Sequence, residues 1–415
     1  MGDEFTAPAG DPGILRGDLP GDAPVYLDHN ATTPLDPRAL EAMLPWLAGR
    51  HGNPSSVHAA GRAAREAVET ARERVAALLG ARPPEVVFTA SGTEANNAVV
   101  YGVAEAAGHR GRIVLSPLEH PSVRKAAARA AERGMAVDSI DPGPDGVVPA
   151  EAVVAALRDD TRLVSMMLAS NELGTIQPVA EVAAACRERG VPLLCDAVQA
   201  AGKIPVDAAA LGADFVVLGG HKFHGPLGAA ALWVRPGVEL PPLLVGGGQE
   251  RRRRASTPNV PALVGFGRAA ELAAAELPAR HRHLAGLRDR FETGLGPIGG
   301  TTVHGRGAPR LPNTSHVAFE NLEGEPLMIR LDLAGFEVST GSACASGTVE
   351  PSPALLAMGV PAAEALSSLR VSVGMPTTAG EIDRFLTALG REVAALRDLL
   401  GGGRPSGVAA EAVRA

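Results

Sequence analysis

The stretch FVVLGGHK, residues 215–222, places a lysine shortly after a short apolar run. Four apolar residues followed by glycine are typical of a strand that is buried on both faces, as in a parallel sheet. Lys222 would then lie just past the carboxyl end of this strand, where open α/β sheets bind their ligands. Desolvation in such a crevice lowers the pKa of a lysine and frees its amine to react with an aldehyde. A surface lysine after a strand is the simpler alternative.

Asp196 ends a second apolar run, residues 192–195, and should lie at the same edge of the sheet. An acidic side chain at that edge is what the ring nitrogen of pyridoxal 5'-phosphate (PLP) needs as a partner. A helix N-cap is the alternative, because aspartate is a favoured cap. A cap does not explain Gln199, three residues later, whose side chain is placed to reach the phenolic oxygen of the same ring.

A third apolar run ends at Thr89 and leads through the small residues 90–93 into a helical pattern. Free N–H groups at Gly92 and the hydroxyl of Thr93 would form a cradle for a phosphate. Such loops are common, so this signal is weak by itself. Three strand ends with compatible chemistry are a stronger indication than any one of them.

The remaining chain alternates short apolar runs with helical stretches, which predicts an α/β protein whose mostly parallel sheet is covered on both faces. A helix is predicted over about 59–79 with Gly80 as C-cap, and a final helix begins at a capping box formed by Thr378 and Glu381. Pro278 lies in a long alanine-rich segment, after which a second domain is expected. We predict a flexible leader (1–24), a large domain (25–278) whose first residues pack with the small domain, a small α+β domain (279–400) and a flexible tail (401–415).

The formal net charge of -7 does not indicate binding to the phosphate backbone of a nucleic acid. The basic run 251–254 is interpreted as a solvated face or a local anion site. The sequence has no apolar stretch long enough to span a bilayer. Residues 1–24 lack the basic segment followed by an apolar segment that is typical of a signal peptide. We therefore expect a cytoplasmic protein with no direct nucleic-acid or membrane partner. The three cysteines have no CxxC spacing, which argues against a disulfide framework and against a metal site.

Cys344 lies in a run of small residues, 339–347, that predicts a mobile arm with an exposed, reactive thiol. A buried, inert cysteine is the usual alternative. Cys186, in a predicted helix, and Cys195, in a predicted buried strand, fit that alternative.

From about Val25 to Leu400 the sequence resembles the cysteine desulfurases of the class V aminotransferase group, which have PLP fold-type I. This resemblance implies a seven-stranded, mostly parallel sheet in the large domain. It is carried by ordered stretches: YLDHNATTP (26–34), GNPSS (52–56), 88–97, EH (119–120), SNE (170–172), 196–199, HK (221–222), 246–259, 341–346 and 368–370.

The resemblance implies a role for each matching residue. Lys222 would hold PLP, Asp196 would pair with the ring nitrogen, Gln199 with the ring oxygen, and His120 would stack on the ring. An imidazole also titrates near neutrality, so His120 could take a proton from the substrate amine or thiol, and a structural histidine is the alternative. The phosphate would be bound by Gly92, Thr93 and His221, and by Thr257 from the second subunit of a homodimer. The ring or the substrate would be contacted by Asn171, Arg370, Asn53, Ala31 and Thr32.

The implied reaction takes sulfur from L-cysteine onto Cys344 as a persulfide, releases alanine and passes the sulfur to an acceptor protein, such as an iron-sulfur scaffold, a thiolation enzyme or a sulfur carrier. A selenocysteine lyase and a non-catalytic PLP-binding docking protein remain as alternatives.

Three positions depart from the family pattern: Gly219, where a serine that binds the phosphate is usual, Pro258, where an acidic residue is common, and Met375, where an arginine is common.

Overall fold

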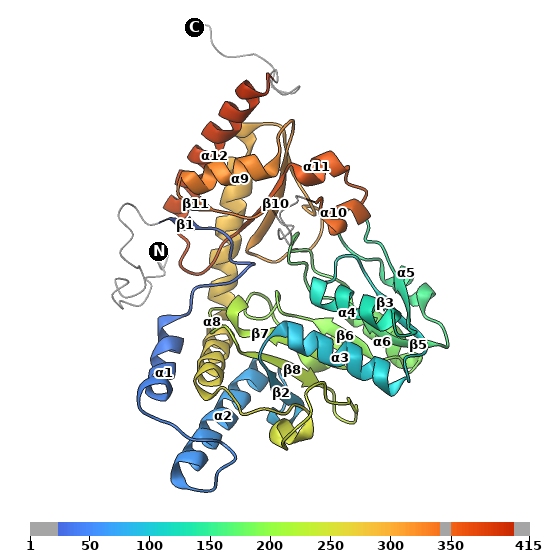
Figure 1. Ribbon diagram of the computed structural model, residues 1–415. Helices are drawn as coiled ribbons and strands as arrows, with labels where there is room; N and C mark the ends of the chain where they lie inside the picture. The colour runs from blue at the N-terminus through green and yellow to red at the C-terminus, as the bar shows by residue number, and fades with distance from the viewer. Residues whose placement is uncertain (1–23, 341–349, 402–415) are drawn as a thin grey trace, which may run out of the picture.

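A seven-stranded sheet forms the centre of the larger part of the protein in the computed structural model, which describes residues 24–340 and 350–401 (Figure 1). The strands follow the order β2-β8-β7-β6-β5-β3-β4, and all neighbours run parallel except β8, which is antiparallel to both β2 and β7. The predicted α/β class with a mostly parallel sheet is thus confirmed. The strand bounds are β2 (Val86–Thr89), β3 (Arg112–Leu115), β4 (Ala136–Ser139), β5 (Thr161–Ser165), β6 (Leu193–Asp196), β7 (Phe215–Gly219) and β8 (Ala230–Val234).

Strand β7 shows why this sheet needs helices on both faces, because every residue in it is buried. Phe215 and Val217 pack with α3 (Gly92–Ala106) and α4 (Pro121–Ala131) on one face. Val216 and Leu218 belong to the core cluster on the other face. That second cluster includes residues of α2 (Ala59–Leu78), α5 (Ala150–Ala156), α6 (Val179–Glu188), α7 (Ala208–Leu211), α8 (Val260–Gly294) and α1 (Pro37–Ala48).

The smaller part of the protein is built on an antiparallel sheet of order β12-β10-β9 and has a separate hydrophobic cluster. Strand β1 (Val25–Tyr26) pairs in parallel with β11 (Phe336–Glu337), so the start of the chain packs with this smaller part. Its other elements are β9 (Thr301–Val303), β10 (Thr314–Phe319), β12 (Ser368–Ser372), α9 (Gly324–Leu333), α10 (Pro353–Ala357), α11 (Ala362–Leu366) and α12 (Ala379–Leu399).

Helix α8 connects the two parts without interruption, and Pro278 lies inside it. Leu272 and Ala273 are buried before the proline, and Leu284 and Leu287 pack in the smaller part's cluster after it. Packing on both sides offsets the hydrogen bond that proline cannot donate. The domain boundary at 278/279 therefore falls within a helix and stays a prediction. The leader and tail lie outside the described residues, apart from Pro24 and Gly401.

Two predicted helix ends are confirmed. Helix α2 ends at Leu78, and Gly80 has the positive φ, +60°, that a left-handed residue after a helix requires. Helix α12 begins at Ala379 after the N-cap Thr378, whose hydroxyl accepts from the N–H of Glu381 while that glutamate accepts from the N–H of Thr378.

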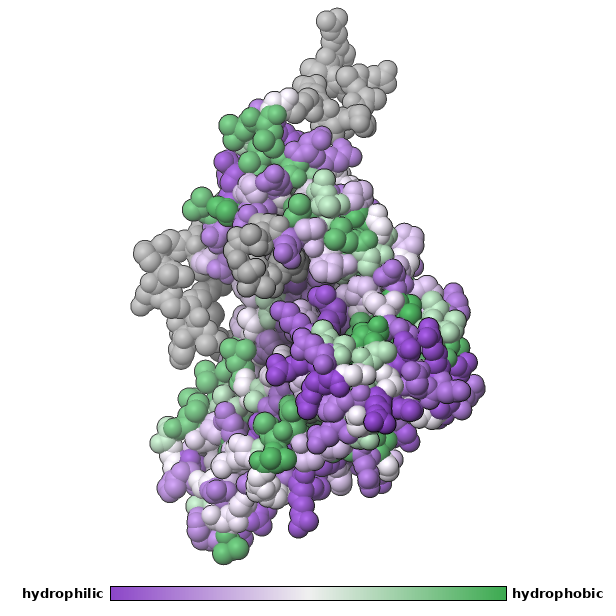
Figure 2. Space-filling model, turned by 45° about the vertical axis from the view of Figure 1, so that its right-hand side comes forward, coloured by the Kyte–Doolittle hydropathy of each residue, from purple (hydrophilic) through white to green (hydrophobic). Residues whose placement is uncertain are grey.

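Exposed hydrophobic side chains lie in small, separate groups among polar ones on the face seen in Figure 2. The most exposed of them include Val57, Leu227, Val245 and Leu333. Within the described part of the chain, no helix is both long and apolar enough to cross a membrane.

Candidate functional site

Lys222 lies in a short 3-10 turn, η3 (Gly220–Lys222), directly after β7, as the sequence predicts. Its Nζ donates to the carbonyl oxygens of Asn30, at 2.6 Å, and Ala31, at 2.7 Å. The pKa of this amine is lowered to about 8, mainly by burial and also by the positive charge of Arg370, while Asp196 and Asp28 act in the opposite direction. A substantial fraction of the amine is therefore neutral and nucleophilic near neutral pH.

Asp196 is the last residue of β6, the strand beside β7, and its side chain is buried. Asn96 of α3 donates to Oδ2 at 2.8 Å, and the N–H of Val198 donates to Oδ1 at 3.0 Å. Each carboxylate oxygen accepts up to two hydrogen bonds, so the group retains capacity for a further donor.

Gln199 is buried close to the same strand end. Its Nε2 donates to the carbonyl of Asn30 at 2.9 Å, the oxygen that also accepts from Lys222. The side chains of Lys222 and Gln199 thus converge on one backbone oxygen, which is 192 residues from Lys222 and 169 residues from Gln199 in sequence.

The N-terminus of α3 begins at Gly92 and Thr93, next to these strand ends, and Ser91 caps it by accepting from the N–H of Glu94. The first N–H groups of a helix have no partner within it, so this end can bind an anion. A Cβ on Gly92 would lie 3.0 Å from Cγ2 of Val198, so a larger residue would crowd this corner.

His221 is fixed by a 3.1 Å contact between Nδ1 and the hydroxyl of Thr32. Its pKa is lowered to about 4, mainly by burial and also by the charges of Lys222 and Lys203, so the ring is neutral near neutral pH. Its neighbour Gly219 departs from the family pattern, and a Cβ there would meet Cγ1 of Val198 at 3.2 Å. A serine at position 219 would require Val198 to shift, which accounts sterically for glycine here.

His120 caps α4, its Nδ1 accepting from the N–H of Ser122 at 3.1 Å. This hydrogen bond assigns the proton of the neutral ring to Nε2. Desolvation lowers the pKa of His120, Lys222 and Arg124 lower it further, and Asp196 opposes them. Nε2 can therefore donate directly, but it can accept a proton only after the ring changes tautomer and loses the bond to Ser122.

An open hollow of about 650 Å³ lies beside His120 and Thr93, lined mainly by residues of α3 and α4. Asn97, Tyr101 and Lys125 are among its walls. It gives the edge of the site access to solvent.

Arg370, in the middle of β12, brings the smaller part of the protein to this site. Its Nη2 donates to Asp28 at 2.6 Å and its Nη1 donates to the carbonyl of Asn171 at 3.1 Å. Nε is buried without a hydrogen-bond partner. An unpartnered, buried guanidinium N–H is costly unless a ligand supplies an acceptor.

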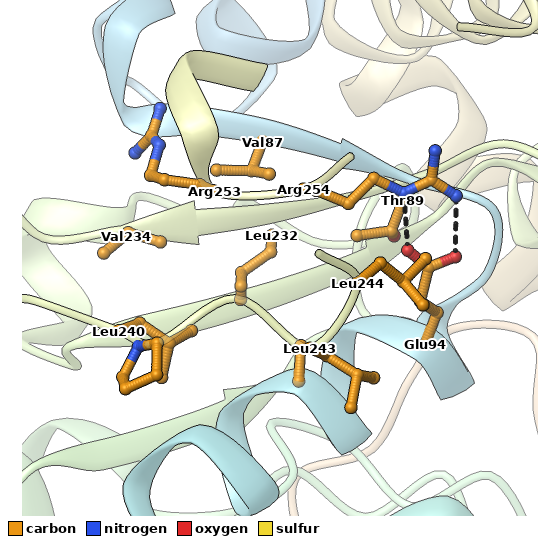
Figure 3. A pocket seen from close by; sticks show the side chains of 12 residues that line it. Val87, Thr89, Glu94, Leu232, Val234, Leu240, Leu243, Leu244, Arg253 and Arg254 are labelled. Carbon is orange, nitrogen blue, oxygen red and sulfur yellow. Dashed lines mark hydrogen bonds and ion pairs between the residues drawn. The ribbon is translucent and has the colours of Figure 1, made fainter. Parts of the chain in front are cut away.

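Thr257 lies in an exposed segment between η4 (Gln249–Arg252) and α8. Arg254 of this segment pairs with Glu94 in the first turn of α3 at 2.7 Å, across one end of a small pocket with apolar walls (Figure 3). Glu250 pairs with buried Arg72 at 2.7 Å and also accepts from the N–H of Phe88. These anchors hold the segment against the sheet although Glu250 and the next two residues have positive φ angles.

The single chain does not bring every predicted residue together. Asn53 is exposed in the loop between α1 and α2, where its side chain accepts from the N–H of Ser55. No described hydrogen bond joins Asn53 or Thr257 to the cluster around Lys222. Cys344 lies outside the described residues, whereas Cys186 and Cys195 are buried.

Four residues around the cluster were not predicted from the sequence as parts of the site. Asn30 contributes a backbone oxygen, Asp28 pairs with Arg370, Asn96 supports Asp196, and Lys203 contacts Gln199. The first three lie in stretches that carry the family resemblance, but backbone and supporting contacts have no residue-type signal. Lys203 had one signal, a lone lysine directly after two alanines and a glycine.

Comparison with known proteins gives consistent results. Residues 25–385 match the model of the family "Aminotransferase class-V". The chain is 43% identical over 376 residues to "Cysteine desulfurase IscS" of Methanosarcina thermophila, covering 90% of this chain and 93% of the relative. It is 46% identical over 378 residues to "Cysteine desulfurase" of Cereibacter sphaeroides, covering 90% of this chain and 97% of the relative.

Solved structures extend the likeness to the fold. A structure titled "NIFS-LIKE PROTEIN" superposes with a TM-score of 0.85 at 37% identity, over 90% of this chain and all of that chain. One titled "SspA in complex with cysteine" gives a TM-score of 0.76 at 32% identity, over 84% of this chain and 99% of that chain. Sequence and fold agree that this chain belongs to the class V aminotransferase family.

Proposed function

We propose that this protein is a PLP-dependent cysteine desulfurase, which converts L-cysteine to L-alanine and takes up the sulfur as a persulfide on Cys344. The observation that carries the proposal is the placement of Lys222. Its amine has a pKa of about 8 and lies at the sheet edge that also carries Asp196 and Gln199. The cysteine desulfurases among its relatives, at 43% and 46% identity, support the same activity.

The chemistry of the donors fits PLP. An aldehyde needs an amine, which Lys222 supplies, and a pyridine nitrogen needs an acid, which Asp196 supplies with spare acceptor capacity. A phosphate fits the first turn of α3 at Gly92 and Thr93. Arg370 adds a buried Nε with no partner, which suits the carboxylate of an amino-acid substrate.

Bound PLP would supply an electron sink that withdraws electrons from the α-carbon of an attached amino acid, and this would in turn weaken its bond between Cβ and sulfur. Asp196 would hold a proton on the ring nitrogen, since an ionised carboxylate stabilises the pyridinium form. Gln199 would donate from Nε2 to the ring oxygen. Asn171, whose backbone carbonyl accepts from Arg370, would orient the ring and the substrate.

The phosphate would be held by Gly92, Thr93 and His221, and by Thr257 of a second copy of the chain. Neutral His221 donates or accepts according to its tautomer, and its Nδ1 contacts the hydroxyl of Thr32, which can act in either sense. Position 219 contributes no hydroxyl, so the phosphate would rely more on the remaining donors.

Substrate cysteine would be held by Arg370 through its carboxylate, with Asn171, Asn53, Ala31 and Thr32 around it. His120 would stack on the ring and donate from Nε2. The bond between Cβ and sulfur of the substrate would break while a bond forms between that sulfur and Sγ of Cys344. The electron pair of the broken bond stays with Cβ, which takes up a proton and becomes the methyl group of alanine. The thiol of Cys344 and the thiol of the substrate together supply that proton and the proton of the persulfide.

The two buried cysteines are poor alternatives as sulfur acceptors. Burial raises the pKa of Cys186 to about 12, and burial also raises the pKa of Cys195 well above its usual value. Only a thiolate attacks efficiently, so neither thiol is reactive near neutral pH. This supports Cys344 as the acceptor.

A homodimer is part of the proposal, because Thr257 lies outside the cluster of its own chain. Leu243, Leu244 and Val245 are exposed near the same segment, as expected of a surface that a second subunit covers. The persulfide would then pass to a sulfur-acceptor protein.

The test is mass spectrometry after a single turnover with cysteine, combined with borohydride reduction of the purified protein. A sulfur adduct on Cys344 and a pyridoxyl group on Lys222 are expected. Cys344→Ala should still fold and bind PLP, yet form neither persulfide nor catalytic alanine, while the matched control Cys186→Ala should form both. A sulfur adduct on Cys186 or Cys195, or full alanine production by Cys344→Ala, contradicts the proposal.

A further inference from the structure

Lys203 is a buried lysine that the proposed reaction does not use. It lies in the turn between β6 and α7, and only 4% of its surface is exposed. Its Nζ donates to Oε1 of Gln199 at 2.8 Å. Of the 39 lysines and arginines in the chain, only three are lysines: Lys125, Lys203 and Lys222. Two of the three are therefore at one site.

Lys203 has no acidic partner among the residues that the structure describes. The charged groups that shift its pKa are Lys222 and Arg370, and both act in the same direction as burial, lowering it well below the usual value. Lys203 in turn lowers the pKa values of His29, His221 and His224. A buried amine with only cationic neighbours is costly. An anion bound at this site would remove that cost.

The contacts with Lys203 and with the carbonyl of Asn30 together determine which way the amide of Gln199 points. The amine of Lys203 can donate in its charged and in its neutral form, and Gln199 presents Oε1 to it. Nε2 then faces the other way and donates to the carbonyl of Asn30 at 2.9 Å. Turning the amide over would set nitrogen against Nζ and oxygen against the carbonyl oxygen, and both hydrogen bonds would be lost.

The consequence is that an N–H donor faces the amine of Lys222. Nε2 of Gln199 and Nζ of Lys222 share the Asn30 carbonyl, and the amide keeps a second N–H for another acceptor. An acceptor atom attached close to Lys222 can therefore accept from Nε2 of Gln199. The contact of Oε1 of the same amide with Lys203 helps to keep this N–H donor in its orientation.

We propose that Lys203 is a positioning residue that orients the amide of Gln199 so that it donates to an anionic oxygen of the group bound at Lys222, and that this anion is the counter-charge of Lys203. The inference rests on the proposed function, because PLP attached through its aldehyde carries a phenolic oxygen next to the point of attachment. An oriented donor backed by a cation stabilises the oxygen as an anion. It therefore lowers the pKa of the chromophore at Lys222.

The test is a spectroscopic pH titration of the PLP-loaded protein, with the dissociation constant of PLP and the thermal stability of the PLP-free protein measured beside it. In Lys203→Met the pKa of the chromophore should rise by about one pH unit, the size of one hydrogen bond to a charged oxygen. PLP should bind more weakly, and the PLP-free protein should be as stable as wild type or more stable, because a buried amine without an acidic partner is gone.

Two further variants separate orientation from general damage. Gln199→Glu keeps an acceptor for Lys203 but has no N–H to donate, so its chromophore pKa should also rise. Gln199→Leu combined with Lys203→Met should raise the pKa no more than Gln199→Leu alone, because the lysine acts through the glutamine. Additive shifts, or a Lys203→Met protein with unchanged chromophore pKa and PLP affinity, overturn the inference. A wild-type protein that forms no chromophore at Lys222 instead overturns the proposed function.

Discussion

Arg370 donates to the carboxylate of Asp28 at 2.6 Å, which joins β12 of the smaller part to the segment just after β1. The guanidinium is therefore already oriented before any substrate arrives, with Nε buried and unpartnered. A planar group held in this way can bind a carboxylate through two hydrogen bonds without a further loss of side-chain entropy.

Replacing Arg370 with lysine should raise KM for cysteine at least about tenfold, with a smaller effect on kcat, because lysine cannot form the two parallel hydrogen bonds. Alanine production measured against cysteine concentration gives both constants. Arg290→Lys is the matched control, since its ion pair with Asp383 is half-exposed on the surface and should contribute little. Equal effects of the two substitutions would remove Arg370 from the substrate site.

Attachment of PLP to the PLP-free protein should speed up with pH. The pKa of Lys222 is lowered from 10.5 to about 8, and the neutral amine is the nucleophile. Its fraction, and so the rate, should rise about tenfold per pH unit below 8 and level off above it. Stopped-flow absorbance measures this rate. A rate that continues to rise towards pH 10 would mean that the pKa of Lys222 is not lowered.

Replacing Asp196 with asparagine should leave PLP bound but reduce turnover by about a hundredfold or more, because a neutral amide does not stabilise a protonated ring nitrogen. Absorbance gives the bound PLP, and alanine release gives the turnover. Asp138→Asn is a suitable control, because Asp138 pairs with Arg112 near the edge strand of the sheet. Near-normal turnover of Asp196→Asn would show that another group serves the ring nitrogen.

Mixing two inactive variants tests whether Thr257 acts in the second subunit. Thr257→Ala should retain PLP poorly, and Lys222→Ala should not attach it at all. A mixed dimer has one site with both Lys222 and Thr257 intact, so random exchange of subunits should restore about a quarter of wild-type activity. No rescue on mixing, together with an active monomer in light scattering, would place Thr257 outside the partner's site.

Much of the fold was predictable from local sequence. Short apolar runs that end in polar residues predicted the strands β6 and β7, and Gly80, Thr378 and Glu381 predicted helix ends, because both signals depend on residues close in the chain. The course of α8 through Pro278 was not predictable, since the helix is stabilised by two cores that residues far apart in sequence build.

The sequence by itself determined which reactive groups the site contains: Lys222, Asp196 and Gln199 at neighbouring strand ends, and Gly92 with Thr93 at a helix start. Parallel strands bring their carboxyl ends to one edge, so chain position is enough to group these residues. Only the tertiary structure decided how they are held. The Asn30 carbonyl, the pairing of Asp28 with Arg370 and the contact of Lys203 with Gln199 join distant segments or depend on side-chain orientation. Such contacts arise from packing between elements, for which a residue's type and its neighbours in sequence carry no signal.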